Sequence, residues 1–159
     1  MICDICIKMT GVNMIIAFCG HSNYVQNIHD KEKILNILEI EAGEAPCEIF
    51  LGGYGGFDAF AFQCVKEFQK SHSNVKLSLV TPYLKNQKDF LQAGEFDSVV
   101  YPNLEHVPPR YAISHRNRWM IGQADVVISH VSHQYGGAYA MYLVAKQKAK
   151  KIYNLVSLQ

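Results

Sequence analysis

The feature that most constrains the fold is an apolar run that leads directly into a cluster of glycines. Residues 49–51 are apolar, and the next five residues hold four glycines around one tyrosine. These five residues are Gly52, Gly53, Tyr54, Gly55 and Gly56. A second apolar segment, with the spacing of a helix, follows at residues 59–68. The order predicts a buried strand, a tight loop and a helix.

This junction has the properties of a ligand site. Glycines allow positive φ angles and let a ligand approach the main chain closely. A helix that begins at the loop directs free N–H groups and its positive dipole end toward an anion such as phosphate. Asp58, at the start of that helix, is placed to cap it or to bind a ribose hydroxyl. We therefore predict that the five loop residues and Asp58 bind a ligand; the alternative is a tight turn without one. The spacing matches neither the dinucleotide fingerprint nor a P-loop.

Strand-like and helix-like segments alternate along the rest of the chain. Strands are expected at residues 14–19, 47–51, 75–81, 99–101, 124–131 and 151–156. Helices are expected at residues 30–39, 59–70, 111–121 and 140–148, with a short one at Phe90 and Leu91. Such alternation predicts a parallel sheet wrapped by helices. Residues 14–159 are expected to form one domain, and residues 1–13 an N-terminal extension.

The composition is that of a globular chain without a strong charge bias. Of the 159 residues, 49% are hydrophobic and 18% charged, and the net charge is +1. Neither a nucleic acid nor a membrane is expected as a partner on this balance. Five cysteines, an odd number, argue against disulfides and predict a reducing, cytoplasmic location. Cys3 and Cys6 form a C-x-x-C pair without a second pair at zinc spacing, so no metal or cofactor is expected.

Two further strand ends carry polar residues suited to a ligand. One follows the apolar run at residues 14–19, and the other follows residues 124–131 and holds a second pair of glycines. Ligands of open α/β sheets bind at the carboxyl ends of strands. The residues predicted to bind a ligand there are Gly20, His21, Ser22, Asn23, Tyr135, Gly136 and Gly137. For His21, a loop histidine that bonds to the backbone is an equally good interpretation.

A cation-rich helical segment lies between these features. Arg110, Arg116 and Arg118 carry forked donors suited to phosphate or carboxylate groups. A solvated basic helix face is the alternative. We predict a ligand-binding role for Arg116, because the segment that follows places it near the second glycine pair.

Residues 116–128, flanked by the two glycine-rich loops, resemble the SLOG superfamily of Rossmann-like domains. The resemblance rests on Arg116 four residues before a Met, then Ala-Asp, an apolar strand and Gly-Gly. The superfamily includes the LOG phosphoribohydrolases, the DNA-processing protein DprA and the YpsA-like proteins. Asp58 after a glycine-rich loop is most similar to the YpsA-like branch. The resemblance covers about residues 14–155 and implies an α/β fold: a doubly wound, mainly parallel sheet with helices on both faces.

The resemblance also implies a function. LOG enzymes remove the base from a nucleoside monophosphate, using an Arg that Arg116 matches and a Glu in a P-G-G-x-G-T-x-x-E loop. Residues 132–141 lack that Pro, Thr and Glu. We therefore expect binding of a nucleotide or an ADP-ribose-like ligand in a cleft formed by both glycine-rich loops. Related domains commonly pair, which implies a homo-oligomer.

Two alternatives remain at this point. The first is an enzyme that cleaves or transfers at an N-glycosidic bond, as a phosphoribohydrolase or a deoxyribosyltransferase does. Asp58 would then supply the catalytic carboxylate, with Arg116 as its catalytic partner and Glu105 as a weaker candidate. The second is an interaction domain whose nucleotide fold is empty, because fold does not fix function.

Overall fold

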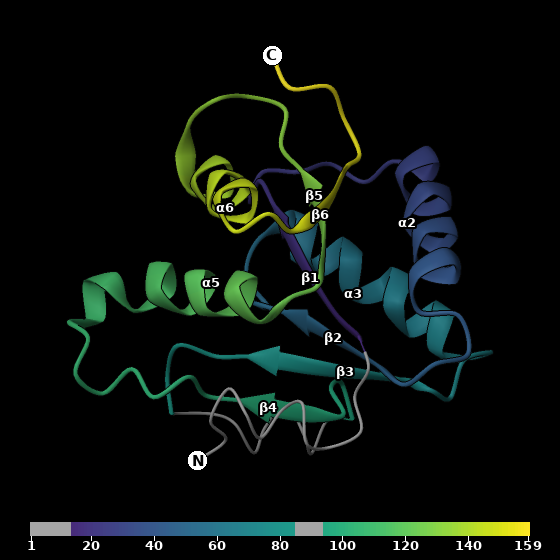
Figure 1. Cartoon of the computed structure of the whole chain (residues 1–159), viewed down its shortest axis with the longest axis horizontal. Helices are drawn as coiled ribbons and strands as arrows, with labels where there is room; N and C mark the ends of the chain where they lie inside the picture. The colour runs from purple at the N-terminus through teal and green to yellow at the C-terminus, as the bar shows by residue number, and fades with distance from the viewer. Residues whose placement is uncertain (1–13, 85–93) are drawn as a thin grey trace.

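The core of the protein is a parallel sheet in the order β4-β3-β2-β1-β5-β6 (Figure 1). The computed structural model describes residues 14–84 and 94–159. The strands are β1 (Met14–Gly20), β2 (Cys47–Leu51), β3 (Val75–Val80), β4 (Ser98–Val100), β5 (Val126–His130) and β6 (Lys151–Asn154). Every pairing among them is parallel. The doubly wound α/β class is thereby confirmed, and the sheet is more regular than the mainly parallel one expected.

Helices cover both faces of this sheet (Figure 1). They are α2 (Ile28–Glu41), α3 (Gly56–Gln69), α5 (Ala112–Gln123) and α6 (Gly136–Gln147), with a 3₁₀ turn, η1 (Pro109–Tyr111), before α5. Alternate strand residues point to opposite faces. Ile16 and Phe18 of β1 therefore pack with α2 and α3, whereas Ile15 and Ala17 pack with α5 and α6. Burial on both faces explains why the strands are continuous apolar runs.

Several element boundaries differ from those expected. Helix α2 begins at Ile28 because Asn27 caps it, accepting a hydrogen bond from the His29 N–H at 2.8 Å. Asp30, where the helix was expected to begin, is buried and accepts a hydrogen bond from the Tyr24 hydroxyl at 2.9 Å. The loop glycines at 56 and 136 are the first residues of α3 and α6.

Some expectations fall on parts of the chain that the structure does not describe. The short helix at Phe90 and Leu91, the extension at residues 1–13 and the Cys3–Cys6 pair all lie outside the described residues. Among the helices of residues 14–84 and 94–159, none combines the length and apolar character that crossing a membrane requires.

The end of β1 tests how tightly the core is packed. An added Cβ at Gly20 would lie 2.3 Å from Cδ1 of Phe57, a fully buried ring, whereas one at Gly122 would meet nothing closer than 3.8 Å. Gly20→Ala should therefore lower the free energy of unfolding by about 1–3 kcal/mol through overpacking. Gly122→Ala, the control on α5, should keep or raise it by up to about 1 kcal/mol. Urea unfolding followed by circular dichroism measures both, and equal stability of the two variants would contradict this packing.

Candidate functional site

A cleft of about 460 Å³ lies at the carboxyl edge of the sheet. It sits where the strand order reverses, since β1 is flanked by β2 on one side and β5 on the other. This reversal is where ligands of open α/β sheets bind. The predicted ligand residues that line the cleft are Gly20, His21, Ser22, Asn23, Tyr54, Asp58, Arg116, Tyr135, Gly136 and Gly137. The structure thus brings both glycine-rich loops, the end of β1 and α5 to one site.

The glycines of the first loop face protein atoms and do not line this cleft. A Cβ added at any of these four glycines would lie within about 3 Å of a protein atom. At Gly52 that atom is the Arg116 guanidinium carbon at 3.0 Å, and at Gly53 it is Cδ1 of Leu79 at 2.7 Å. At Gly55 it is Cα of Ser22 at 2.8 Å, and at Gly56 it is the carbonyl oxygen of Tyr24 at 2.6 Å. Two of them, Gly53 and Gly55, also have positive φ angles of 69° and 91°. In this loop, the atoms that come close to the glycines belong to the protein and not to a ligand.

The second loop is open where the first is filled. Apart from the adjacent residues and the backbone of the helix itself, no heavy atom of the described residues lies within 4 Å of a Cβ added at Gly136 or Gly137. Helix α6 begins at Gly136, and its N-cap residue, Tyr135, makes no side-chain capping hydrogen bond. The first N–H groups of a helix have no partner within it. Gly136, Gly137 and Ala138 all line the cleft, so this uncapped helix start lies within it. Helix starts of this kind favour anions.

Arg116 is buried and holds the carboxyl ends of two strands. Its side chain is 2% exposed, so the interpretation as a solvated basic face is wrong for this residue. Nη1 donates to the carbonyl oxygens of Gly52 at 2.7 Å and Val80 at 2.6 Å, and Nε donates to Oδ1 of Asn117 at 2.7 Å. The arginine therefore ties α5 to the ends of β2 and β3. Arg110 and Arg118, in contrast, are exposed.

Asp58 lies in the first turn of α3 and lines the cleft. Its Oδ2 accepts a hydrogen bond from the Tyr54 N–H at 3.1 Å, which fixes the loop. Burial raises the pKa of Asp58 to about 6, against the opposing effects of the Tyr54 N–H and the Arg116 charge. A carboxyl group with such a pKa changes protonation near neutral pH, as a general acid or base must. Glu105, the weaker carboxylate candidate, is exposed and does not line the cleft.

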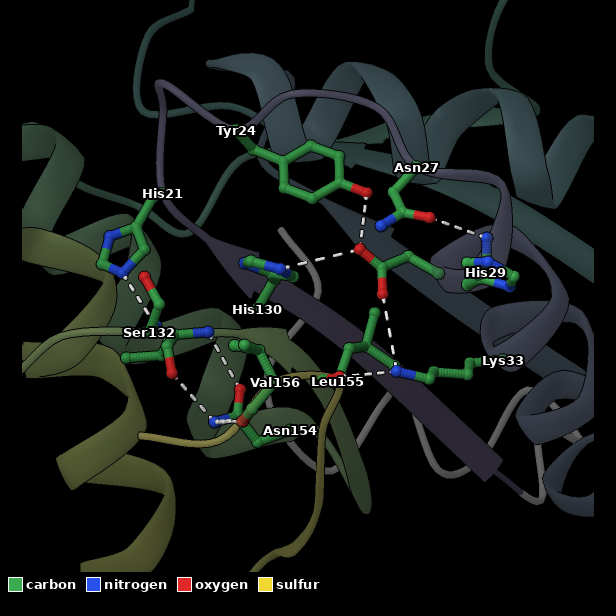
Figure 2. A network of polar contacts seen from close by, with 12 residues as sticks. His21, Tyr24, Asn27, His29, Lys33, His130, Ser132, Asn154, Leu155 and Val156 are labelled. Atoms are coloured by element: carbon green, nitrogen blue, oxygen red, sulfur yellow. Dashed lines mark hydrogen bonds and ion pairs between the residues drawn. The ribbon is translucent and has the colours of Figure 1, made fainter. Parts of the chain in front are cut away.

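A column of aromatic rings borders the open helix start. His21 is 9% exposed, and its ring stacks on His133 with centroids 3.7 Å apart and planes at 8°. His133 in turn contacts Tyr135 at a centroid distance of 4.0 Å. Nε2 of His21 accepts a hydrogen bond from the Ser132 N–H at 3.2 Å (Figure 2). His21 thus bonds to the backbone and also lines the cleft, so it fits both interpretations made from the sequence.

Several residues that line the cleft were not among the predicted ligand residues. They are Phe18, Cys19, Ile113, Asn117, Met120, His133, Ala138 and Met141. His133 had a detectable signal, because it lies in the loop after β5 with Tyr135. Asn117 had none, because only its contact with Arg116 places it at the cleft. Among the described residues, no group of three His, Cys, Asp or Glu side chains is arranged to hold a metal.

Comparison with known proteins relates the fold to solved structures. No family model matches the sequence, and no curated protein sequence matches it. DNA processing protein A (DprA) from Streptococcus pneumoniae is 19% identical and aligns over 91% of this chain and 50% of its own, with a TM-score of 0.65. DprA from Helicobacter pylori is 18% identical over 94% of this chain and 68% of its own, with a TM-score of 0.64. The structural genomics target TM1055 is 18% identical over 87% and 72%, with a TM-score of 0.56.

These likenesses establish the fold. The chain has the same α/β fold as DprA, a protein that the SLOG superfamily includes. The closer relation to the YpsA-like branch stays a prediction. The chain spans half the length of the S. pneumoniae protein.

The expectation that no nucleic acid is a partner is wrong. The H. pylori protein, whose fold matches 94% of this chain, is described as binding single-stranded DNA. The argument from bulk charge failed because phosphate groups are bound by local cations and backbone N–H groups. A net charge of +1 over the whole chain does not measure either of these.

The difference between the two glycine-rich loops predicts opposite effects on stability. Gly56→Ala should lower the free energy of unfolding by about 1–3 kcal/mol, since its Cβ would lie 2.6 Å from a backbone oxygen. Gly137→Ala, also in a first helical turn, should leave stability unchanged or raise it by up to about 1 kcal/mol. Urea unfolding of both variants provides the measurement. A destabilised Gly137→Ala would show that the second loop is not open.

The raised pKa of Asp58 predicts a pH-dependent contribution to stability. Because the folded pKa of about 6 exceeds the ordinary aspartate pKa of 3.8, the native state holds the proton more tightly than the unfolded chain. The resulting stabilisation is present below about pH 4 and is lost as pH rises through 6. The stability of wild type relative to Asp58→Asn should therefore fall between pH 4 and pH 7 in urea unfolding. Glu105→Gln, at an exposed carboxylate, is the control; a flat difference for Asp58→Asn would refute the shift.

Proposed function

We propose that the protein binds a nucleotide or a nucleotide-derived ligand of the ADP-ribose type, with a phosphate at the start of α6. The observation that carries this proposal is the uncapped, unobstructed first turn of α6 inside the cleft at the strand reversal. Free N–H groups and the helix dipole together favour a phosphate there. A volume of about 460 Å³ suits a small molecule, since such sites commonly measure about 300–1,000 Å³.

The rest of the cleft offers groups for the other parts of a nucleotide. Tyr54 and Tyr135, on the two loops, are 69% and 71% exposed and present aromatic faces on which a base can stack. Asn23, Asn117 and Asp58 line the cleft and carry the polar groups that ribose hydroxyls require. Phosphate, sugar and base would each find a suited partner within one site.

The same chemistry can come from a free nucleotide or from a nucleotide within a single strand. The single-stranded DNA binding described for the H. pylori protein supports the second source. Stacking on exposed aromatic residues and phosphate binding by backbone N–H groups serve both. A binding experiment must therefore include a short oligonucleotide beside the mononucleotides.

An enzymatic role at an N-glycosidic bond is the second candidate. Asp58 favours it, because it is the one carboxylate among the described residues that lines the cleft, and its pKa is about 6. A group with that pKa can act as base or nucleophile near neutral pH. The hydrogen bonds of Arg116 go to backbone and to Asn117, so we assign it a positioning role beside Asp58.

We also propose that the protein works in a reducing compartment such as the cytoplasm. Cys19, Cys47 and Cys64 are free and buried in the described part of the chain. Burial raises the pKa of the Cys19 and Cys47 thiols to about 12. Such thiols act as core residues and not as nucleophiles.

Calorimetry with AMP, adenosine, ADP-ribose and a short oligothymidine tests the proposal. AMP should bind and adenosine should bind at least about tenfold more weakly, because the phosphate contacts are lost. Gly137→Val places a branched side chain in the first turn of α6, where it would block the phosphate. The variant should keep the fold and bind AMP at least about tenfold more weakly, and Gly122→Ala is the control. Equal affinities for AMP and adenosine, or an unaffected Gly137→Val, would refute the phosphate site.

The same samples separate binding from catalysis. Chromatography of the AMP and ADP-ribose incubations detects released base. Release that stops in Asp58→Asn supports the enzyme, whereas tight binding without release supports a binding protein. Preference for the oligothymidine over every mononucleotide would assign the site to single-stranded DNA.

A further inference from the structure

The side chain of His21 contacts the second loop from the end of β1. It follows the last residue of that strand, and its Nε2 accepts a hydrogen bond from the Ser132 N–H at 3.2 Å. A ring nitrogen that accepts such a bond must present its lone pair. The proton of the neutral ring is therefore held on the other nitrogen, Nδ1. The loop before α6 thus fixes one tautomer of this histidine.

The surroundings also favour the neutral ring. His21 stacks face to face on His133 at 3.7 Å, a geometry that disfavours positive charge on both rings. Burial, and the neighbouring His133 and His130, lower the pKa of His21 from its ordinary value. At neutral pH the ring is then an uncharged donor at Nδ1 and an acceptor at Nε2.

The Nδ1–H group has no hydrogen-bond partner among the described residues, although the side chain is only 9% exposed. Figure 2 shows one ring nitrogen of His21 joined to Ser132 and the other turned away from it. The ring lines the same cleft as Gly136 and Gly137. Among the described residues, the buried side-chain nitrogen or oxygen without a partner is Nδ1 of His130, so Nδ1 of His21 keeps contact with solvent. A ligand acceptor in the cleft can therefore take the place of water at this donor.

We propose that His21, as its neutral Nδ1–H tautomer, donates a hydrogen bond to the anionic group bound at the start of α6. This role rests on the proposed function and adds a recognition residue to it. The hydrogen bond from Ser132 sets the tautomer and also joins the end of β1 to the loop before α6. The side-chain donor and the helix N–H groups are therefore held in fixed relation, which lowers the entropy cost of binding.

Two substitutions of His21 separate the roles of its two ring nitrogens. In His21→Gln, the side-chain oxygen can replace Nε2 as the acceptor for Ser132, but the Nδ1 donor is lost. In His21→Asn, the amide nitrogen can replace Nδ1 as donor, but the acceptor for Ser132 is lost. With AMP as the probe in calorimetry, His21→Gln should lose at least about tenfold in affinity, and His21→Asn should lose less.

The stabilities of the two variants should rank in the opposite order to their affinities for AMP, and the unfolding measurement also shows whether each variant folds. His21→Gln keeps the bond between the loops and should unfold closer to wild type in urea than His21→Asn does. His21→Gln that binds AMP as tightly as wild type overturns the proposal while leaving the proposed function intact. Failure of the wild type to bind both AMP and inorganic phosphate overturns the two together.

A measurement on the ligand-free protein tests the tautomer directly. Nitrogen NMR of the ¹⁵N-labelled histidine rings distinguishes a protonated from an unprotonated nitrogen, and His21→Gln assigns the His21 signals. The expected result at pH 7.5 is a protonated Nδ1 and an unprotonated Nε2. A protonated Nε2 overturns the proposal whatever the affinity for AMP.

Discussion

The geometry of the cleft depends on the burial of one cation. The Arg116 guanidinium donates to carbonyl oxygens at the ends of β2 and β3, which have no further strand residues to bond them. Burying a charge is costly unless its donors are satisfied and an opposite charge is near, and Asp58 supplies that charge. The carboxylate in turn accepts from the Tyr54 N–H. The first glycine-rich loop is shaped by this chain of contacts, which leaves the second loop free for a ligand.

Much of the fold could be predicted from the sequence, because each strand buried on both faces is a continuous apolar run. The helix starts were less predictable. Asn27 and Asp30 are both good caps, and only the contact of Asp30 with Tyr24 in the folded chain decides between them. The alternation of strand and helix also placed the candidate cleft at the correct edge, since parallel strands end together.

The sequence could not reveal which of the site residues face the protein and which face the cleft. The two glycine-rich loops differ because a Cβ at position 56 would meet the backbone oxygen of Tyr24 at 2.6 Å, a contact between segments that no local pattern encodes. The burial of Arg116 was missed for the same reason: its partners lie on two other strands. The tautomer of His21 follows from a single hydrogen bond to residue 132, 111 positions away.

The openness of the second loop has a consequence for how such a domain could diverge. A side chain at position 137 would meet no other segment, whereas one at position 56 would meet the backbone oxygen of Tyr24 at 2.6 Å. One codon change to a bulky residue at position 137 would therefore block the proposed anion site and leave the scaffold intact. The proposed recognition and the fold could thus be lost independently, and a bulky residue at this one position would mark a relative that keeps the fold without the site.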